Sequence, residues 1–306
     1  MLKTFIILCL ILPAILLSGC ATTYNPATEQ QELVFVTTSM EVALGKMLAA
    51  RIPSQFKISK DNLYIDRIKK IGENIARVSD RKDLEYHFAV IEDEGLNAFT
   101  SPGGYLYVNS GVMEKSSDDE LACVIGHEVG HVAARHVAKK LQAQLGYDIL
   151  MNIAMRNNAG LRSLQKAASI SYNLITLGYS REDELLADRL GVKYAYKAGY
   201  DPYAMVSFLE KIKESKGEEL GFIFLRSHPY AAQRIKMLKM QIPAIIDKID
   251  RKNDIKAVRQ TQLPKRSEPA PITIKKERPL RVMCPTCKKI FSGQTNYCPY
   301  DGTALH

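Results

Sequence analysis

Two histidines and a glutamate lie within five consecutive residues, in the segment His127-Glu128-Val129-Gly130-His131. On an α-helix, residues four apart share a face, so His127 and His131 can hold one metal ion from the same side. Glu128 follows His127 directly in the sequence, and its carboxylate can accept a hydrogen bond from a water molecule bound to the metal. The pattern is typical of a hydrolytic zinc site. The alternative is a buried helix whose histidines only satisfy hydrogen bonds in the core.

The flanking residues predict the helix that this site requires. Ser117 followed by Glu120 forms a capping-box pattern, and Asp118 and Asp119 suit the positive end of a helix dipole. Apolar residues then continue without an interrupting proline. We therefore expect a helix from about residue 118 to about residue 141.

A catalytic zinc usually takes three protein ligands, so a third must come from elsewhere in the chain. The spacing used by metzincins, in which a third histidine follows the His-x3-His pair, would require a histidine at position 137, which is Val137. His136 falls one residue early and is expected to point elsewhere on the helix. Glu184 is the better candidate. It shares a helix face with Asp188, which would orient a ligand imidazole through a hydrogen bond without binding the metal itself. The small Ala187 would let the helix that bears Glu184 approach the first helix closely. Spacing alone leaves open that these acidic residues form a solvated face.

Several ordered motifs resemble those of the HtpX-like zinc metalloproteases, a family of gluzincins that also holds the CAAX prenyl proteases. The likeness is closest to the periplasmic, BepA-like branch and covers about residues 25–242. The motifs that carry it are Gly126 to His136, Tyr179 to Asp188, Ala198 to Pro202, Ser227 to Pro229 with Arg234, and Asn97 to Val108. The resemblance implies that His127, His131 and Glu184 bind zinc and that Glu128 is the general base.

His228 is the best candidate for a functional side chain outside the metal helices, with Arg234 six residues further on. It could donate a hydrogen bond to the oxyanion that forms when a peptide carbonyl is attacked. In the resembling branch this histidine can instead sit on the metal and hold the enzyme latent. A turn histidine with no contact to zinc is the third possibility, and the sequence leaves all three open.

A small β-sheet is predicted just before the metal helix. Residues 84–92 have the pattern of a strand, and residues 97–99 and 105–108 predict a hairpin around a Ser-Pro-Gly-Gly turn. The residues alone favour an ordinary hairpin packed on the core. The resemblance instead favours an exposed edge that receives a polypeptide substrate as an added strand, formed by Asn97, Ala98 and Phe99.

The amino terminus predicts where the chain works. An apolar run from Phe5 to Leu17 is too short to span a bilayer comfortably, and Leu17-Ser18-Gly19-Cys20 is a pattern at which lipoprotein signal peptides are cut. We therefore expect Cys20 to become the lipidated first residue; a retained membrane anchor is the alternative. Ala21 after the cysteine permits transport to the outer membrane in Gram-negative bacteria. These features predict a lipid-anchored protein on the periplasmic face of that membrane.

The carboxy-terminal tail is basic and contains closely spaced cysteines. Residues 251–306 carry 12 Lys and Arg against 4 Asp and Glu, whereas residues 20–250 carry 29 of each. The tail could dock an anionic surface or a protein partner, or act only as a solvated linker. Its cysteines are spaced as in a zinc ribbon, except that Asp301 replaces the fourth. A structural zinc would then be completed by Asp301 or His306, and a disulfide is the alternative; the cysteines are Cys284, Cys287 and Cys298.

Together these patterns predict an α+β, predominantly helical fold. Its main part is a gluzincin metalloprotease domain with a small sheet beside the metal helix. The predicted order is a signal peptide (residues 1–19), a lipidated tether (20–35), the metalloprotease domain (36–250), a basic flexible linker (251–281) and a zinc-ribbon-like module (282–306).

The predicted function is zinc-dependent hydrolysis of peptide bonds in misfolded or misassembled envelope proteins. One catalytic zinc is expected, with a second, structural zinc in the tail. The rival from another class is a latent or non-proteolytic assembly factor or chaperone that bears zinc. The presence of Glu128 favours the enzyme, because a protein that no longer hydrolyses peptide bonds has no chemical need of a general base. We expect polypeptide partners and no nucleic acid.

Overall fold

The computed structural model of the chain describes residues 22–144, 178–214 and 224–251, and in the tail residues 281–283, 286, 288 and 290–292. The chain divides into two compact units, residues 1–261 and residues 262–306. The described part of the first unit is mostly helical with small sheets, as predicted, and holds every element that positions the candidate site.

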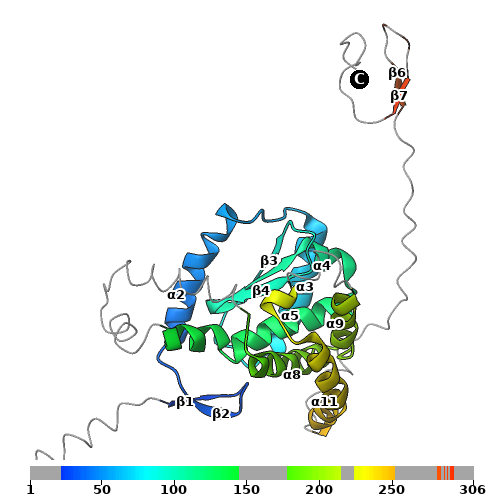
Figure 1. The fold of residues 1–306 in the computed structure, drawn as a ribbon. Helices are drawn as coiled ribbons and strands as arrows, with labels where there is room; N and C mark the ends of the chain where they lie inside the picture. The colour runs from blue at the N-terminus through cyan, green and yellow to red at the C-terminus, as the bar shows by residue number, and fades with distance from the viewer. Residues whose placement is uncertain are drawn as a thin grey trace, which may run out of the picture. The chain divides into compact units, whose positions relative to one another are not determined.

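One central helix, α5 (Asp118–Ala133), organises the first unit. A three-stranded sheet and α3 (Asn62–Val78) pack on one side of it, and α8 (Arg181–Lys197) lies along the other (Figure 1). The helix α9 (Ala204–Glu214) packs against α5, and α11 (Ala231–Arg251) packs against α8 and α9. Further helices of this unit include α2 (Thr38–Ala49), α4 (Ser110–Lys115) and the 3-10 turns η1 (Ile52–Ser54) and η2 (Pro102–Gly104).

The three-stranded sheet has the strand order β3-β5-β4. The strand β3 (His87–Ile91) runs parallel to β5 (Tyr105–Asn109), and β4 (Ala98–Ser101) pairs with β5 in antiparallel register. The predicted hairpin is confirmed, while the first strand is shorter than the predicted residues 84–92. The strand β4 forms one edge of the sheet and contacts α5. The edge predicted to receive a substrate is thus an edge strand next to the metal helix.

The helix α5 begins where the sequence predicts and ends earlier. Ser117 and Glu120 form both hydrogen bonds of the capping box. The predicted end near residue 141 is wrong, because the helix stops at Ala133 and a separate helical stretch covers residues 136–144. Arg135 lies between them with φ of 60°, a left-handed conformation that a non-glycine residue seldom adopts. The Arg135 guanidinium contacts the Glu41 carboxylate and the Val36 carbonyl, and these contacts hold the turn.

The helices α5 and α8 approach so closely that their backbones touch. A Cβ atom on Gly126 would lie 2.8 Å from the Gly191 carbonyl oxygen, and one on Gly191 would lie 2.7 Å from the His127 nitrogen. A Cβ atom on Gly130 would lie 2.9 Å from the carbonyl oxygen of Ala187. The close approach expected from Ala187 is therefore present, and it depends equally on three glycines that the sequence analysis did not single out.

The amino-terminal hairpin packs against the end of the metal helix. The strands β1 (Thr22–Asn25) and β2 (Gln30–Leu33) pair in antiparallel register, within the range predicted as a tether. The buried Asn25 amide donates a hydrogen bond to the carbonyl of Ala133, the last residue of α5. The hairpin therefore satisfies one of the carbonyl groups that a helix leaves unpaired at its carboxyl end.

The second unit contains one described hairpin, formed by β6 (Arg281–Met283) and β7 (Ile290–Ser292) in antiparallel register. The tail cysteines and Asp301 lie outside the described residues, as do Cys20 and residues 252–280 of the predicted linker. Within the part of the chain that the structure describes, no helix is both long and apolar enough to cross a lipid bilayer.

The contact between α5 and α8 gives a first prediction. Gly191→Ala forces a methyl group against the backbone of His127, and overpacking of this kind costs about 1–3 kcal/mol of unfolding free energy. The measurement is urea unfolding of the metal-free protein. The control is Arg189→Ala on the exposed face of the same helix, which should change the unfolding free energy by less than about 0.5 kcal/mol. Equal stability of the two variants would contradict the prediction.

Candidate metal centre

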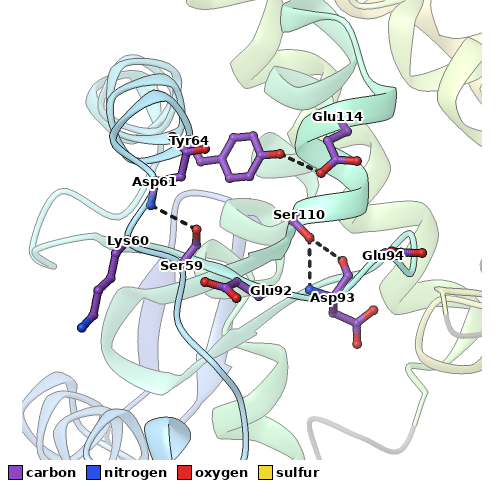
Figure 2. Close-up of a pocket in the computed structure, with 9 residues that line it drawn as sticks. All are labelled: Ser59, Lys60, Asp61, Tyr64, Glu92, Asp93, Glu94, Ser110 and Glu114. Carbon is purple, nitrogen blue, oxygen red and sulfur yellow. Dashed lines mark hydrogen bonds between the residues drawn. The ribbon is translucent and has the colours of Figure 1, made fainter. Parts of the chain in front are cut away.

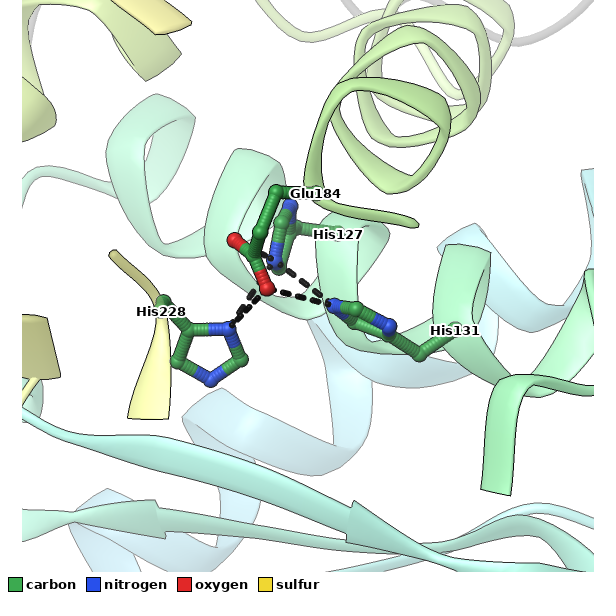
Figure 3. A group of neighbouring side chains, drawn as sticks. All are labelled: His127, His131, Glu184 and His228. Carbon is green, nitrogen blue, oxygen red and sulfur yellow. Dashed lines mark hydrogen bonds and ion pairs between the residues drawn. The ribbon is translucent and has the colours of Figure 1, made fainter. Parts of the chain in front are cut away.

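Four buried side chains meet beside α5 with their donor atoms facing one another. They are His127 and His131 from α5, Glu184 from α8 and His228 from the segment before α11 (Figure 3). One ligand atom of each lies within 4.8 Å of those of the other three. Figure 3 shows the Glu184 carboxylate pointing toward the imidazoles from above α5. The three residues predicted to bind zinc are therefore brought together, and His228 joins them.

The spacing of these donor atoms fits a tetrahedral zinc ion. The Nε2 atoms of His127 and His131 are 3.0 Å apart. His127 Nε2 lies 3.5 Å from Glu184 Oε2, and His131 Nε2 lies 3.5 Å from Glu184 Oε1. With zinc–ligand bonds of about 2.0–2.1 Å, neighbouring ligands of a tetrahedron lie about 3.3 Å apart. Two imidazoles and one carboxylate are also a donor set that zinc accepts in catalytic sites. The residues present thus fit a zinc ion.

Glu128 is buried, and both of its carboxylate oxygens lack a hydrogen-bond donor in the part of the chain that is described. His228 Nε2 lies 3.3 Å from its Oε1, without the geometry of a hydrogen bond. Burial raises the pKa of this carboxyl group, since the charged form loses its solvation. A buried carboxylate without a hydrogen-bond partner lowers the stability of a fold, so its presence calls for a functional explanation. The position of Glu128 beside the ligand residues suits a general base.

A buried arginine balances the acidic groups behind the site. The Arg234 guanidinium donates to both Asp188 carboxylate oxygens at 2.7 and 2.8 Å, and its Nη1 lies 2.7 Å from Glu184 Oε2. Burial opposes ionisation of Asp188 and Glu184, but Arg234 and the neighbouring histidines together outweigh it and hold the pKa of both carboxyl groups below their usual range. Both carboxylates are therefore charged at neutral pH. Asp188, which we expect to orient a ligand imidazole, is therefore itself held by Arg234, a residue that the sequence singled out through its spacing from His228.

Asp188 also fixes the orientation of the His127 imidazole. Its Oδ1 lies 2.9 Å from His127 Nδ1, which leaves Nε2 facing the other ligand atoms. Burial lowers the pKa of His127, but the carboxylates of Asp188 and Glu184 reverse this and raise it to about 9 in the metal-free protein. A metal binding at neutral pH must therefore displace a proton from His127.

The second imidazole has partners that the sequence analysis missed. His136 was expected to point elsewhere, but its Nδ1 lies 2.8 Å from His131 Nδ1. The ring of Tyr179 stacks on His131 with centroids 3.8 Å apart, and burial raises the Tyr179 pKa well above its usual range. Both residues lie in motifs that carry the family resemblance, which was the only available signal for them.

His228 occupies the place of a fourth ligand and also touches the sheet edge. Its Nδ1 lies 3.1 Å from Glu184 Oε1 and 3.3 Å from His127 Nε2. Its Nε2 donates to the carbonyl of Ala98 in β4 at 3.3 Å, and the neighbouring Ser227 hydroxyl donates to the Asn97 side chain. In this structure the chain's own segment therefore lies at the edge predicted for substrate. The third residue of that edge, Phe99, stacks on Tyr107 instead.

A second concavity lies apart from these residues. It is a surface pocket of about 500 Å³ between the start of α3, the end of β3 and α4 (Figure 2). Five of its nine lining side chains are acidic. Its Tyr64 hydroxyl donates to Glu114 and its Ser110 hydroxyl to the Asp93 carbonyl, so these polar groups already have partners (Figure 2). We assign no function to this pocket.

Comparison with known proteins agrees with this geometry. The sequence profile described as Peptidase family M48 matches residues 63–242, which include α5, α8 and the segment bearing His228. The match covers more than half of the chain. The protein belongs to peptidase family M48.

Three of the chain's relatives are named as proteases. The chain is 33% identical over 171 residues to "Mitochondrial metalloendopeptidase OMA1" of Arabidopsis thaliana, covering 56% of this chain and 34% of the relative. It is 26% identical over 218 residues to "Beta-barrel assembly-enhancing protease" of Escherichia coli, covering 65% and 43%. It is 26% identical over 183 residues to "Metalloprotease LoiP" of the same species, covering 59% and 71%. The chain thus spans less than half the length of the first two.

The buried charges of the site give a second prediction. Arg234→Met leaves two buried carboxylates without their cation and should lower the unfolding free energy by about 3–5 kcal/mol at pH 7 with a chelator present. Asp188 and Glu184 have lowered pKa values in the folded protein. Their stabilisation is therefore present above the pKa of the unfolded groups, near pH 4, and is lost as the pH falls through the folded values. Without Arg234, burial should raise the pKa of both carboxyl groups in the folded variant, so they would take up protons between pH 7 and pH 4. The cost of the variant should therefore shrink over that range.

Urea unfolding at the two pH values measures this effect. The matched control is Arg251→Met at the exposed end of the same helix, whose ion pair with Asp247 should contribute at most about 1 kcal/mol. A cost of Arg234→Met that does not depend on pH would assign the loss to packing instead of charge.

Proposed function

We propose that this chain is a zinc-dependent endopeptidase. One observation carries the proposal: three ligand side chains at zinc spacing lie beside Glu128, a buried carboxylate with no hydrogen-bond partner among the described residues. The named proteases among its relatives support the same class. The chain covers only part of those relatives, so its activity and substrates are proposed from its own residues.

Each side chain then has a defined task. His127, His131 and Glu184 would hold the zinc ion, with Asp188 and Arg234 orienting His127 and Glu184 from behind. Zinc in such a site supplies Lewis acidity and lowers the pKa of a water molecule to about 7. Glu128 would take the proton from the attacking water and pass it to the leaving amide nitrogen. Its raised pKa suits a group that must both accept and return a proton.

His228 has two possible roles, and its geometry favours a latent resting state. Its Nδ1 lies among the ligand atoms and its Nε2 bonds to Ala98 at the sheet edge. A substrate strand pairing with β4 would have to displace it. After displacement the same imidazole could donate a hydrogen bond to the oxyanion.

The proposed setting is the bacterial cell envelope, with misfolded or misassembled proteins as substrates. Support comes from the lipoprotein pattern ending at Cys20 and from similarity to a beta-barrel assembly-enhancing protease. Mass spectrometry of the mature protein should find an acylated Cys20. An uncut or unmodified amino terminus would contradict this setting. A non-proteolytic assembly factor is less well supported, since Glu128 is retained and the named relatives are proteases.

For the tail, we propose a structural zinc held by Cys284, Cys287 and Cys298 with Asp301 or His306. The described hairpin of β6 and β7 flanks the first two of these cysteines in the sequence, which suits a ribbon. Metal analysis should therefore find a second zinc ion per chain. A disulfide between Cys284 and Cys287 would replace this proposal.

The test of the proposed activity is Glu128→Gln in the protein beginning at Ala21. The amide keeps the shape of the side chain and removes the base, so zinc content should stay at the wild-type value while casein hydrolysis is lost. Glu184→Ala is the contrasting variant and should lower zinc affinity, because it removes a ligand. Wild-type turnover by zinc-loaded Glu128→Gln protein would refute the mechanism.

His228→Ala separates the two roles of that residue. If His228 caps the metal, basal casein hydrolysis should rise; if it stabilises the oxyanion, turnover should fall by about a hundredfold. His87→Ala is the matched control, because His87 lies in β3, outside the ligand group, stacked on Tyr105. Unchanged turnover in both variants would leave His228 as a turn residue only.

A further inference from the structure

The contact between His131 and His136 has a defined direction once His131 binds a metal. His131 Nε2 faces the ligand group, 3.0 Å from His127 Nε2. Its Nδ1 must then keep the ring proton, because a ligand imidazole is neutral and carries one N–H. Among the residues described, the acceptor within hydrogen-bond distance of that N–H is His136 Nδ1, at 2.8 Å.

The acceptor nitrogen of His136 fixes the proton on its other nitrogen. His136 Nε2 lies 3.3 Å from Asp183 Oδ1 and can donate to it. Asp183 is itself held at the start of α8, where its Oδ2 accepts from the Ser180 backbone nitrogen and Ser180 Oγ accepts from the Asp183 nitrogen. We propose that His136 is a positioning residue that orients His131 by accepting its Nδ1 proton, in a relay that ends on Asp183. The inference rests on the proposed zinc centre.

The backbone turn at Arg135 makes this contact possible. In an uninterrupted helix, residues five apart point about 140° away from each other, so His136 would face away from His131. The left-handed φ of Arg135 redirects the chain, and both imidazoles are buried with their ring planes 70° apart. Arg135 is held there by Glu41, a buried residue that also pairs with Arg81. The left-handed conformation of Arg135, which is unfavourable in itself, therefore places His136 next to His131 in the proposed zinc centre.

The two ligand imidazoles thus have different partners. His127 donates to a charged carboxylate reinforced by Arg234, whereas His131 donates to a neutral imidazole. A packing role for His136 would need only its shape. A positioning role needs an acceptor at the place of Nδ1, and this difference can be tested.

Three variants of the full chain separate the roles. His136→Leu fills the space without an acceptor and should raise the zinc dissociation constant by about 10- to 100-fold, the usual effect of losing such a partner. His136→Asn can place its amide oxygen near the position of Nδ1 and should stay within about threefold of wild type. His87→Leu is the matched control, since His87 does not contact the ligand group, and should keep wild-type zinc affinity. Affinity is measured by competition with a chromogenic chelator.

Wild-type zinc affinity in His136→Leu would overturn the proposal, as would an equal loss in His136→Leu and His136→Asn. If His136→Leu fails to fold, the ring nitrogens of the zinc-loaded wild type decide the question. Nitrogen-15 NMR should show the His136 proton on Nε2 and a bare Nδ1; a proton on Nδ1 would overturn the proposal. Failure of the wild type to bind zinc at this site would instead refute the proposed function, so the two failures are distinguishable.

Discussion

The backbone contact between α5 and α8 is the constraint on which the site depends. Gly126, Gly130 and Gly191 have no Cβ atom at the places where the two helices touch, so the helix axes can come closer than larger residues allow. This approach brings Glu184 and Asp188 of α8 to the imidazole of His127. A wider separation would leave two histidines facing an incomplete ligand set. Side chains at the crossing therefore matter to the chemistry without touching a metal or substrate.

Charge is the second constraint, because the same crossing buries three carboxylates. Glu128, Glu184 and Asp188 are all fully buried, and Arg234 is the buried cation that contacts the last two. Glu128 is left without a hydrogen-bond partner among the residues described. The three carboxyl groups therefore differ in a way that suits their proposed roles. Contact with Arg234 favours the ionised form of Glu184 and Asp188, whereas burial without a hydrogen-bond partner raises the pKa of Glu128, the group expected to exchange a proton.

Local patterns in the sequence predicted much of this arrangement. The capping box at Ser117, the four-residue spacing of the histidines and the hairpin around Pro102 all depend on neighbouring residues, and the structure contains them. The end of α5 could not be predicted locally. Its left-handed Arg135 is held by Glu41 and Val36, which are 94 and 99 residues away in the chain. The position of His136 follows from that turn, so it was also missed. The glycines at the helix crossing were a visible signal that was left unused.

The hydrogen bond from Asn25 to the end of α5 limits how far the proposed enzyme could reach. Asn25 is the fifth residue after Cys20, and five extended residues span at most about 18 Å. If Cys20 carries a lipid, the carboxyl end of the metal helix would be confined to a thin layer beside the bilayer. Peptide bonds would then be selected by their height above the membrane before any side chain is recognised. Such an enzyme would act on polypeptides only where they come within that layer.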